Sequence, residues 1–285
     1  MAMTGTVTKK PLMNRTLNQE PSLPVMAQEI KPQEYRQVKK SGALTGQVAL
    51  VTGGAVRLGR AISLALAREG CHVAIHYHRS AGAARVTARE ARRLGVLALP
   101  IRADLSRPAQ ARRLVAATRR RFGRLDILVN NAALFLRTPL STTTRQQWDR
   151  LLDVNLRGPF LCAQAAAPAM LKRKSGRIIN IADVGGMHAW PSYLPYCISK
   201  AGLLMLTKGL ALALAPHIQV NSVAPGAVLL PKNSPARLRR RLRRTVPMGR
   251  EGSPADVAAA VVFFASAPSY ITGQVLFVDG GITSR

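Results

Sequence analysis

Short runs of mostly apolar residues alternate with longer segments of mixed polarity from Gln47 to the C-terminus. Such apolar runs are typical of strands that are covered on both faces of a parallel sheet. The longer segments between them have the composition and period of helices. The expected strands are residues 48–51, 73–76, 96–101, 127–129, 177–182, 218–223 and 275–278, and the clearest expected helices are residues 57–68, 145–173 and 193–215.

This alternation predicts an α/β fold, a single doubly wound Rossmann domain with a mostly parallel seven-stranded sheet. We expect the domain to span residues 46–285 and to hold both the cofactor site and the substrate site. Residues 1–45 carry scattered lysines and prolines without periodicity, which predicts a mostly disordered N-terminal tail. Three glutamates in that tail argue against a targeting peptide.

The formal net charge of +29 raises the question of an acidic partner. Nucleic acid is one interpretation of such a charge. However, the arginines are spread over nearly every expected helix, and aromatic residues make up only 5% of the chain. We therefore expect no nucleic acid as the primary partner, and a basic field that steers small anionic ligands toward the protein.

Hydropathy and cysteine usage bear on the compartment. No apolar run reaches the roughly 20 residues that a membrane span needs, and the N-terminus lacks the apolar segment of a secretory signal. Cys71, Cys162 and Cys197 form no pattern and are most simply buried thiols of a reducing compartment. We expect a cytoplasmic protein with no membrane partner and no metal site.

A glycine-rich turn lies between the first expected strand and the first expected helix. It contains Gly53, Arg57, Leu58 and Gly59 in the spacing Gly-x3-Arg-x-Gly. Glycines allow the backbone to turn tightly and to approach a pyrophosphate, whose charge the start of the helix stabilises. Arg57 offers a guanidinium that pairs with phosphate directly. The alternative is an ordinary glycine turn.

The residues after the second expected strand indicate which dinucleotide binds. A site for NAD commonly has a carboxylate there, which accepts from the ribose 2′-hydroxyl. This chain instead has Tyr77, His78, Arg79 and Ser80 after His76. A guanidinium and a hydroxyl suit a 2′-phosphate. We therefore predict NADPH as the cofactor, against the simpler interpretation of a solvated basic turn.

Asp183, Tyr196 and Lys200 follow the spacing Asp-x12-Tyr-x3-Lys. A Tyr and a Lys four residues apart lie on the same face of a helix. The ammonium would then favour the phenolate and lower the pKa of Tyr196 from about 10 toward neutrality. Such a phenol exchanges a proton with a substrate at ordinary pH.

In this order the glycine turn, an Asn-Asn-Ala segment and the Tyr-x3-Lys pair resemble the short-chain dehydrogenase/reductase family, over residues 47–285. The resemblance implies that Tyr196 is the proton donor and that Lys200 binds the nicotinamide ribose. It also implies that Asn155 holds a water in a proton relay. Further cofactor contacts implied by the resemblance are Asp104, Leu105, Asn131, Ala132, Pro225 and Gly226.

Most family members have Ser where this chain has Asp183, and pteridine reductases share that departure. They also share an Arg in the glycine turn, the run His-Tyr-His-Arg-Ser, and a Phe that corresponds to Phe135. The resemblance implies that Phe135 stacks a flat pterin against the nicotinamide and that Asp183 and Tyr196 bind it. This chain departs from pteridine reductases at Ala133, where they often have Ser.

We therefore predict NADPH-dependent reduction of a pterin of the dihydrobiopterin, dihydromonapterin or dihydrofolate type to the tetrahydro form. The alternative is an NADPH-dependent reductase of 3-oxoacyl thioesters on acyl carrier protein, or of another carbonyl compound. A non-catalytic protein on a Rossmann scaffold is a third possibility, and the intact Tyr196 and Lys200 argue against it.

Two further segments have expected partners. Residues 237–244 contain six arginines in one expected helix. They are either a solvated face or a contact for an acidic ligand, namely a folate glutamate tail or an acyl carrier protein. By resemblance we also expect a homotetramer, in which helices 145–173 and 193–215 form one interface and the C-terminal strand forms another.

Overall fold

The computed structural model describes residues 42–229 and 235–284. Of the N-terminal tail expected at residues 1–45, residues 1–41 lie outside this description. The last residues of that range belong to the folded domain, because Leu44 is fully buried and its backbone N–H donates to the carbonyl of Glu69 at 3.1 Å. The domain thus begins a few residues before the expected position, since one leucine in a polar context gives no periodic signal.

Seven strands form one sheet in which every pairing is parallel. Their order is β3-β2-β1-β4-β5-β6-β7, so the chain reverses its direction of travel across the sheet between β1 and β4. The strands are β1 (Val48–Val51), β2 (His72–Tyr77), β3 (Ala98–Arg102), β4 (Ile127–Asn130), β5 (Gly176–Ile181), β6 (Ile218–Pro225) and β7 (Val275–Val278). The predicted fold is confirmed, and all seven expected strands overlap the observed ones.

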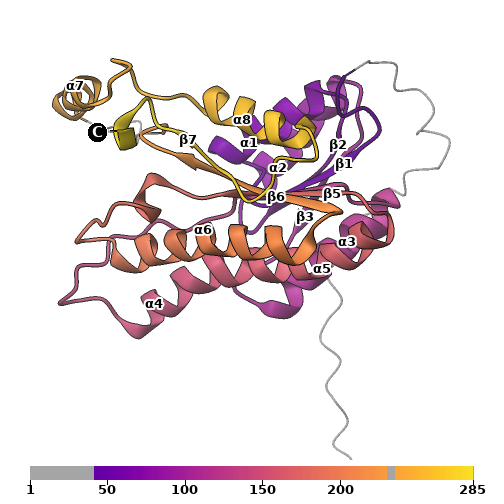
Figure 1. Ribbon diagram of the computed structural model, residues 1–285, viewed down its shortest axis with the longest axis horizontal. Helices are drawn as coiled ribbons and strands as arrows, with labels where there is room; N and C mark the ends of the chain where they lie inside the picture. Colours follow the sequence, from indigo (N-terminus) through magenta and orange to yellow (C-terminus); the bar gives the residue numbers. More distant parts are fainter. Residues whose placement is uncertain (1–41, 230–234, 285) are drawn as a thin grey trace, which may run out of the picture. The chain divides into compact units, whose positions relative to one another are not determined.

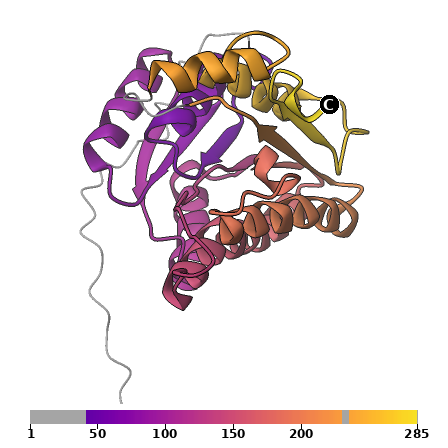
Figure 2. The ribbon, with the colours of Figure 1, turned by 90° about the vertical axis from the view of Figure 1, so that its left-hand side faces the viewer.

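Helices cover both faces of this sheet, as Figures 1 and 2 show. One layer contains α1 (Arg57–Arg68), α2 (Ala81–Arg93) and α8 (Pro254–Ser266), and the other contains α3 (Pro108–Phe122), α5 (Gly158–Lys172) and α6 (Leu194–Leu214). The remaining α-helices are α4 (Arg145–Leu152) and α7 (Ala236–Thr245). Two buried apolar clusters fill the spaces between the sheet and the two layers. This double cover explains why the strands read as continuous apolar runs.

The helix expected at residues 145–173 is continuous but changes its winding. A π-helical segment, Asp153–Arg157, joins α4 to α5. Such bulges insert an extra residue into the helical turn and often occur at functional sites. Here the segment carries the buried side chain of Asn155 toward the loop after β4.

Helix α6 bears on the expectation that no apolar run is long enough to span a membrane. By length and composition alone, its 21 residues pass that test, although only 44% of the best window is buried. A core helix of a globular domain satisfies the same criteria. In this structure α6 contacts β6, α5 and α4, and it contains Tyr196 and Lys200.

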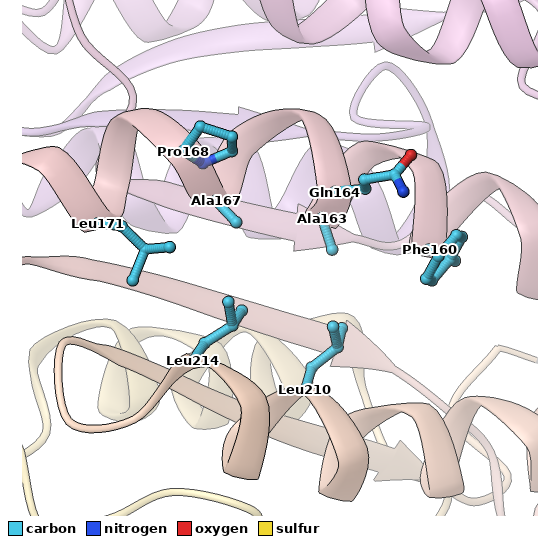
Figure 3. A pocket seen from close by; sticks show the side chains of 8 residues that line it. All are labelled: Phe160, Ala163, Gln164, Ala167, Pro168, Leu171, Leu210 and Leu214. Carbon is cyan, nitrogen blue, oxygen red and sulfur yellow. The ribbon is translucent and has the colours of Figure 1, made fainter.

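A shallow apolar groove lies between the outer faces of α5 and α6. Its volume is about 230 Å³. Figure 3 shows side chains of both helices turned toward one another across it. The lining residues are Phe160, Ala163, Gln164, Ala167, Pro168, Leu171, Leu210 and Leu214. Ile198, Met205 and Leu212, spaced seven residues apart, form an exposed apolar stripe on α6.

Candidate active site

The sequence-predicted site residues gather at the carboxyl ends of the strands. In doubly wound sheets, ligands bind at that edge, in the crevice where the strand order reverses. The reversal lies between β1 and β4, so the loops that follow these two strands form the walls of the crevice. The loop after β5 adds the reacting residues.

The turn after β1 has the backbone that a phosphate site needs. Gly53 has a φ of 62°, and Arg57 has a φ of 50°, which is unusual for a residue with a side chain. A Cβ on Gly59 would lie only 2.0 Å from the carbonyl oxygen of Gly53, so no other residue fits there without moving the turn. The start of α1 therefore remains open to an anion. The guanidinium of Arg57 donates to the carbonyl of Leu229 at 3.3 Å.

His76 is a positioning residue that the sequence interpretation did not identify as such. Its Nδ1 accepts from the N–H of Gly53 at 2.9 Å, and its Nε2 lies 3.1 Å from the carbonyl of Ala103. Burial lowers the pKa of His76 to about 4, so the ring is neutral. A neutral ring with these two partners has its proton on Nε2. His76 thus attaches the glycine turn to β2, whereas the sequence interpretation used it only as the first residue of the His-Tyr-His-Arg-Ser run.

Thr52 holds the turn from the β4 side. Its hydroxyl accepts from the N–H groups of Asn131 and Ala132, at 2.8 and 3.0 Å. In return the Asn131 amide donates to the carbonyls of Thr52 and Gly53. Asn131 therefore positions the turn with its side chain, and Thr52 is a second structural contributor that the motif search missed.

The residues after β2 present polar groups at the surface. Arg79 and Ser80 are exposed, and Tyr77 and His78 are partly buried. Ser80 caps α2 without using its hydroxyl for a capping hydrogen bond. His78 Nε2 lies 3.7 Å from Asp104 Oδ2, which brings the ends of β2 and β3 together. This surface contains a guanidinium and a hydroxyl and no carboxylate before α2, which suits a 2′-phosphate.

The remaining cofactor candidates lie on the same edge. Asp104 Oδ1 accepts from the N–H and the hydroxyl of Ser106, at 3.0 and 2.7 Å. The side chain of Leu105 is buried in the core, so only its backbone faces a ligand. At the end of β6, Pro225 is followed by Gly226, whose N–H donates to the carbonyl of Val278.

Asp183 and Tyr196 are joined by a hydrogen bond. The Tyr196 hydroxyl donates to Asp183 Oδ2 at 2.8 Å, and the N–H of Gly185 donates to Asp183 Oδ1 at 2.7 Å. Asp183 begins a short 3₁₀ turn after β5, and Tyr196 lies in the first turn of α6. The tertiary fold thus brings the carboxylate and the phenol into direct contact.

This contact reverses the expected effect on Tyr196. Burial and the neighbouring Asp183 carboxylate raise the pKa of Tyr196 above its usual value, because both disfavour a phenolate. The expectation that Lys200 lowers it toward neutrality is therefore wrong for the protein without ligands. Burial also raises the pKa of Asp183.

Lys200 is buried beside this pair. Its Nζ donates to the carbonyl of Ile181 at 2.7 Å and lies 5.7 Å from the centre of the Tyr196 ring. Burial lowers the pKa of Lys200 to about 8, and the charge of Asp183 opposes that shift. The Lys200 ammonium is therefore close to losing its proton near pH 8. Its charge state affects how an incoming ligand binds in the crevice.

Asn155 uses its whole side chain to support the site. Its Oδ1 accepts from the N–H of Leu134 at 2.8 Å, and its Nδ2 donates to the Leu134 carbonyl and to the Ser199 hydroxyl. Ser199 in turn donates to the carbonyl of Tyr196 at 2.6 Å. Asn155 therefore fixes the loop after β4 relative to α6.

Four aromatic rings gather above the Asp183–Tyr196 pair. Phe135 stacks on Tyr193 with ring centres 4.6 Å apart and meets Tyr196 edge-on at 4.8 Å. Trp190 lies parallel to Tyr196 at 6.2 Å. Phe135 is 57% exposed, so one face of its ring is open to a ligand. The sequence interpretation proposed Phe135 for this wall, and Tyr193 was missed.

Comparisons with known proteins agree with this arrangement. The profile of a family described as enoyl-(acyl carrier protein) reductase matches residues 53–283. A 3-oxoacyl-[acyl-carrier-protein] reductase of Synechocystis is 40% identical over 245 residues, which cover 84% of this chain and 98% of that protein. A 3beta-hydroxysteroid dehydrogenase of Eggerthella lenta is 40% identical over 247 residues, with coverage of 84% and 95%.

Solved structures show the same fold. A short-chain alcohol dehydrogenase from Sinorhizobium meliloti superposes with a TM-score of 0.81 at 33% identity, covering 85% of this chain and 98% of that one. Acetoin dehydrogenase from Salmonella typhimurium superposes with a TM-score of 0.77 at 37% identity, with coverage of 84% and 96%. From the fold, the site and these similarities together, the chain belongs to the short-chain dehydrogenase/reductase family of oxidoreductases.

Proposed function

We propose that this oxidoreductase uses NADPH to reduce a dihydropterin, of the biopterin, monapterin or folate type, to the tetrahydro form. The observation that carries the proposal is the hydrogen bond of 2.8 Å between the Tyr196 hydroxyl and the Asp183 carboxylate. This hydrogen bond places a proton donor, the Tyr196 hydroxyl, beside an anionic acceptor, the Asp183 carboxylate. A substrate in the crevice would meet both groups.

A carboxylate at this position suits an N–H donor better than a carbonyl. During reduction, a ketone oxygen gains negative charge, and the Asp183 carboxylate would repel it in a crevice of low dielectric. A pterin ring instead presents N–H and amino groups, which a carboxylate accepts. Burial, which raises the pKa of Asp183, also favours a form that gives up a proton to a ring nitrogen.

The aromatic cluster favours a flat substrate. Phe135, Trp190, Tyr193 and Tyr196 contact one another through stacked and edge-on pairs. Parallel stacking is a favourable arrangement for a planar heterocycle. The exposed face of Phe135 therefore offers a surface on which a pterin ring stacks.

The residues at the carboxyl edge fit a dinucleotide: the glycine turn is open at the start of α1, and Arg57 and Arg79 lie nearby. Bound NADPH supplies the hydride. Lys200 would hold the nicotinamide ribose, Tyr196 would deliver the proton, and Asp183 would orient the pterin and share in proton delivery. To reach the substrate, the Tyr196 hydroxyl would turn its hydrogen bond from Asp183 toward the ring.

Reduction of a 3-oxoacyl thioester is the second candidate, and the comparisons favour it. The relative from Synechocystis and several from Staphylococcus are named 3-oxoacyl-[acyl-carrier-protein] reductases. These names support carbonyl reduction more directly than pterin reduction. The geometry around Asp183 supports the pterin, so a direct comparison of the two substrates decides between them.

We expect Asp183→Ser to lower dihydropterin turnover by about 10²-fold, the scale of one acid–base group. The change removes the carboxylate and supplies a hydroxyl that suits a carbonyl oxygen, so weak reduction of acetoacetyl thioester should emerge. The measurement is NADPH oxidation with each substrate. Tyr196→Phe is the control, because it should depress both activities with little change in NADPH affinity. Faster reduction of the thioester than of dihydropterin by the wild-type protein would establish the second candidate instead.

We expect a marked preference for NADPH over NADH. Loss of a charged contact to the 2′-phosphate costs on the order of 1.5–3 kcal/mol. Arg79→Ala should therefore raise the KM for NADPH about tenfold or more and change the KM for NADH little. Equal losses for the two cofactors would remove Arg79 from the phosphate site.

The affinity for NADPH should fall as pH rises through about 8, where the buried Lys200 loses its proton. Asp183→Asn removes a charge that raises this pKa, so the fall should begin at lower pH in that variant. Fluorescence titration of NADPH binding from pH 6 to 10 measures both effects. A flat profile in the wild-type protein, or a shift to higher pH in Asp183→Asn, contradicts this assignment.

We also propose a homotetramer in which α5 and α6 form an interface between copies. The stripe of Ile198, Met205 and Leu212 on α6 is an exposed apolar surface of the kind that two-fold contacts cover. The groove between α5 and α6 is a second apolar surface.

Leu212→Glu should reduce the mass measured by light scattering at micromolar concentration, because it places a charge in this surface. Leu140→Glu is the matched control, since Leu140 is 81% exposed and Leu212 is 83% exposed. A monomeric wild-type protein contradicts the proposal.

A further inference from the structure

Helix α7 presents a row of guanidinium groups that the proposed reaction does not use. The described side chains of Arg237, Arg240 and Arg244 are exposed. Their spacing of three and four residues places them on one face of the helix. With a rise of 1.5 Å per residue, the row is about 10 Å long. We call these three side chains the α7 arginine face.

No described ion pair involves the α7 arginine face. Helix α7 itself contains no acidic residue. Two carboxylates in the segments that follow are engaged elsewhere: Asp256 accepts two hydrogen bonds from Arg250, and Asp279 accepts from the N–H and the hydroxyl of Thr283. Among the described residues, the three guanidinium groups of the α7 arginine face thus have no carboxylate partner.

Both ends of the α7 segment are attached at the carboxyl edge of the sheet. Before the helix, Leu229 accepts a hydrogen bond from Arg57 of the glycine turn. After the helix, Val246 is buried and the N–H of Met248 donates to the carbonyl of Gly280, just beyond β7. Figure 1 shows α7 at the same end of the domain as the loops that carry the reacting residues. The α7 arginine face therefore belongs to the surroundings of the candidate active site.

We propose that the α7 arginine face binds the γ-linked glutamate tail of a folate-type substrate. This inference rests on the proposed pterin reduction and specifies its substrate class. A folate carries its pterin at one end and a chain of carboxylates at the other, so ring and tail would contact different parts of one site. Guanidinium groups pair well with carboxylates, and a row of three matches a ligand with repeated negative charges.

The surface of α7 fits a flexible anionic tail better than a folded partner. An interface with a folded protein has an apolar core within a polar rim. The exposed described side chains on α7 are three arginines, Ala236 and Thr245, so none of them is a large apolar group. A tail of carboxylates needs only charge and reach, and the net charge of +29 would draw it toward the protein.

The test compares dihydrofolate with one glutamate and with five glutamates, and a dihydropterin without a tail. The wild-type protein should have a lower KM for the pentaglutamate form. A triple variant, Arg237→Gln/Arg240→Gln/Arg244→Gln, should raise that KM about tenfold at low ionic strength, with unchanged kcat and unchanged KM for the tailless dihydropterin. The effect should fade as salt screens the charges.

The matched control removes the same charge elsewhere. Arg89→Gln/Arg119→Gln/Arg120→Gln changes three exposed arginines on α2 and α3 and should leave the KM for pentaglutamate near the wild-type value. An equal rise of that KM in the control variant would reduce the effect to overall charge and overturn the assignment to α7.

A binding experiment separates this inference from the proposed reaction. Fluorescently labelled γ-pentaglutamate should bind the wild-type protein and lose about tenfold in affinity with the α7 triple variant, whether or not any pterin is reduced. Absence of pterin turnover would refute the proposed function. Equal binding of the peptide by wild type and variant would refute the role of α7. A variant that loses binding of acyl carrier protein instead of binding of the peptide would refute it as well.

Discussion

The buried carboxylate of Asp183 governs the chemistry of the candidate site. It accepts a hydrogen bond from the Tyr196 hydroxyl at 2.8 Å and raises the pKa of Tyr196. Its charge also opposes the lowering of the pKa of Lys200 by burial. In a crevice of low dielectric, each of these effects is stronger than it would be in water. A hydroxyl at that position would exert none of the charge effects. Asp183 thus departs from the general pattern of its family, and under the proposed function it favours substrates that present N–H donors.

The scaffold around the pair consists of polar side chains that fix backbone. His76 and Thr52 hold the glycine turn from its two neighbouring strands, and Asn155 holds the loop after β4 against α6. Each satisfies buried N–H or carbonyl groups that would otherwise be costly to leave unpaired. The crevice is therefore preorganised by side chains that fix the backbone around it.

Similarity to known proteins and the geometry of the candidate site favour different substrates for this protein. The relatives establish the family and an oxidoreductase, and their names favour carbonyl reduction. An identity of 40% leaves most positions free to change, and substrate choice depends on a few side chains. Asp183 and the aromatic cluster with Phe135 are such side chains, and their arrangement favours a flat ligand with N–H donors.

The sequence by itself determined the alternation of elements, since strands buried on both faces must be apolar and helices must repeat every 3.6 residues. It also located the glycine turn, Tyr196 and Lys200, because these depend on short spacings within one element. Only the tertiary structure decided that Asp183 accepts a hydrogen bond from the Tyr196 hydroxyl and that His76 is a neutral support. It also placed Tyr193 beside Phe135. These features depend on groups that are distant along the chain and on burial, and local sequence carries no signal of either.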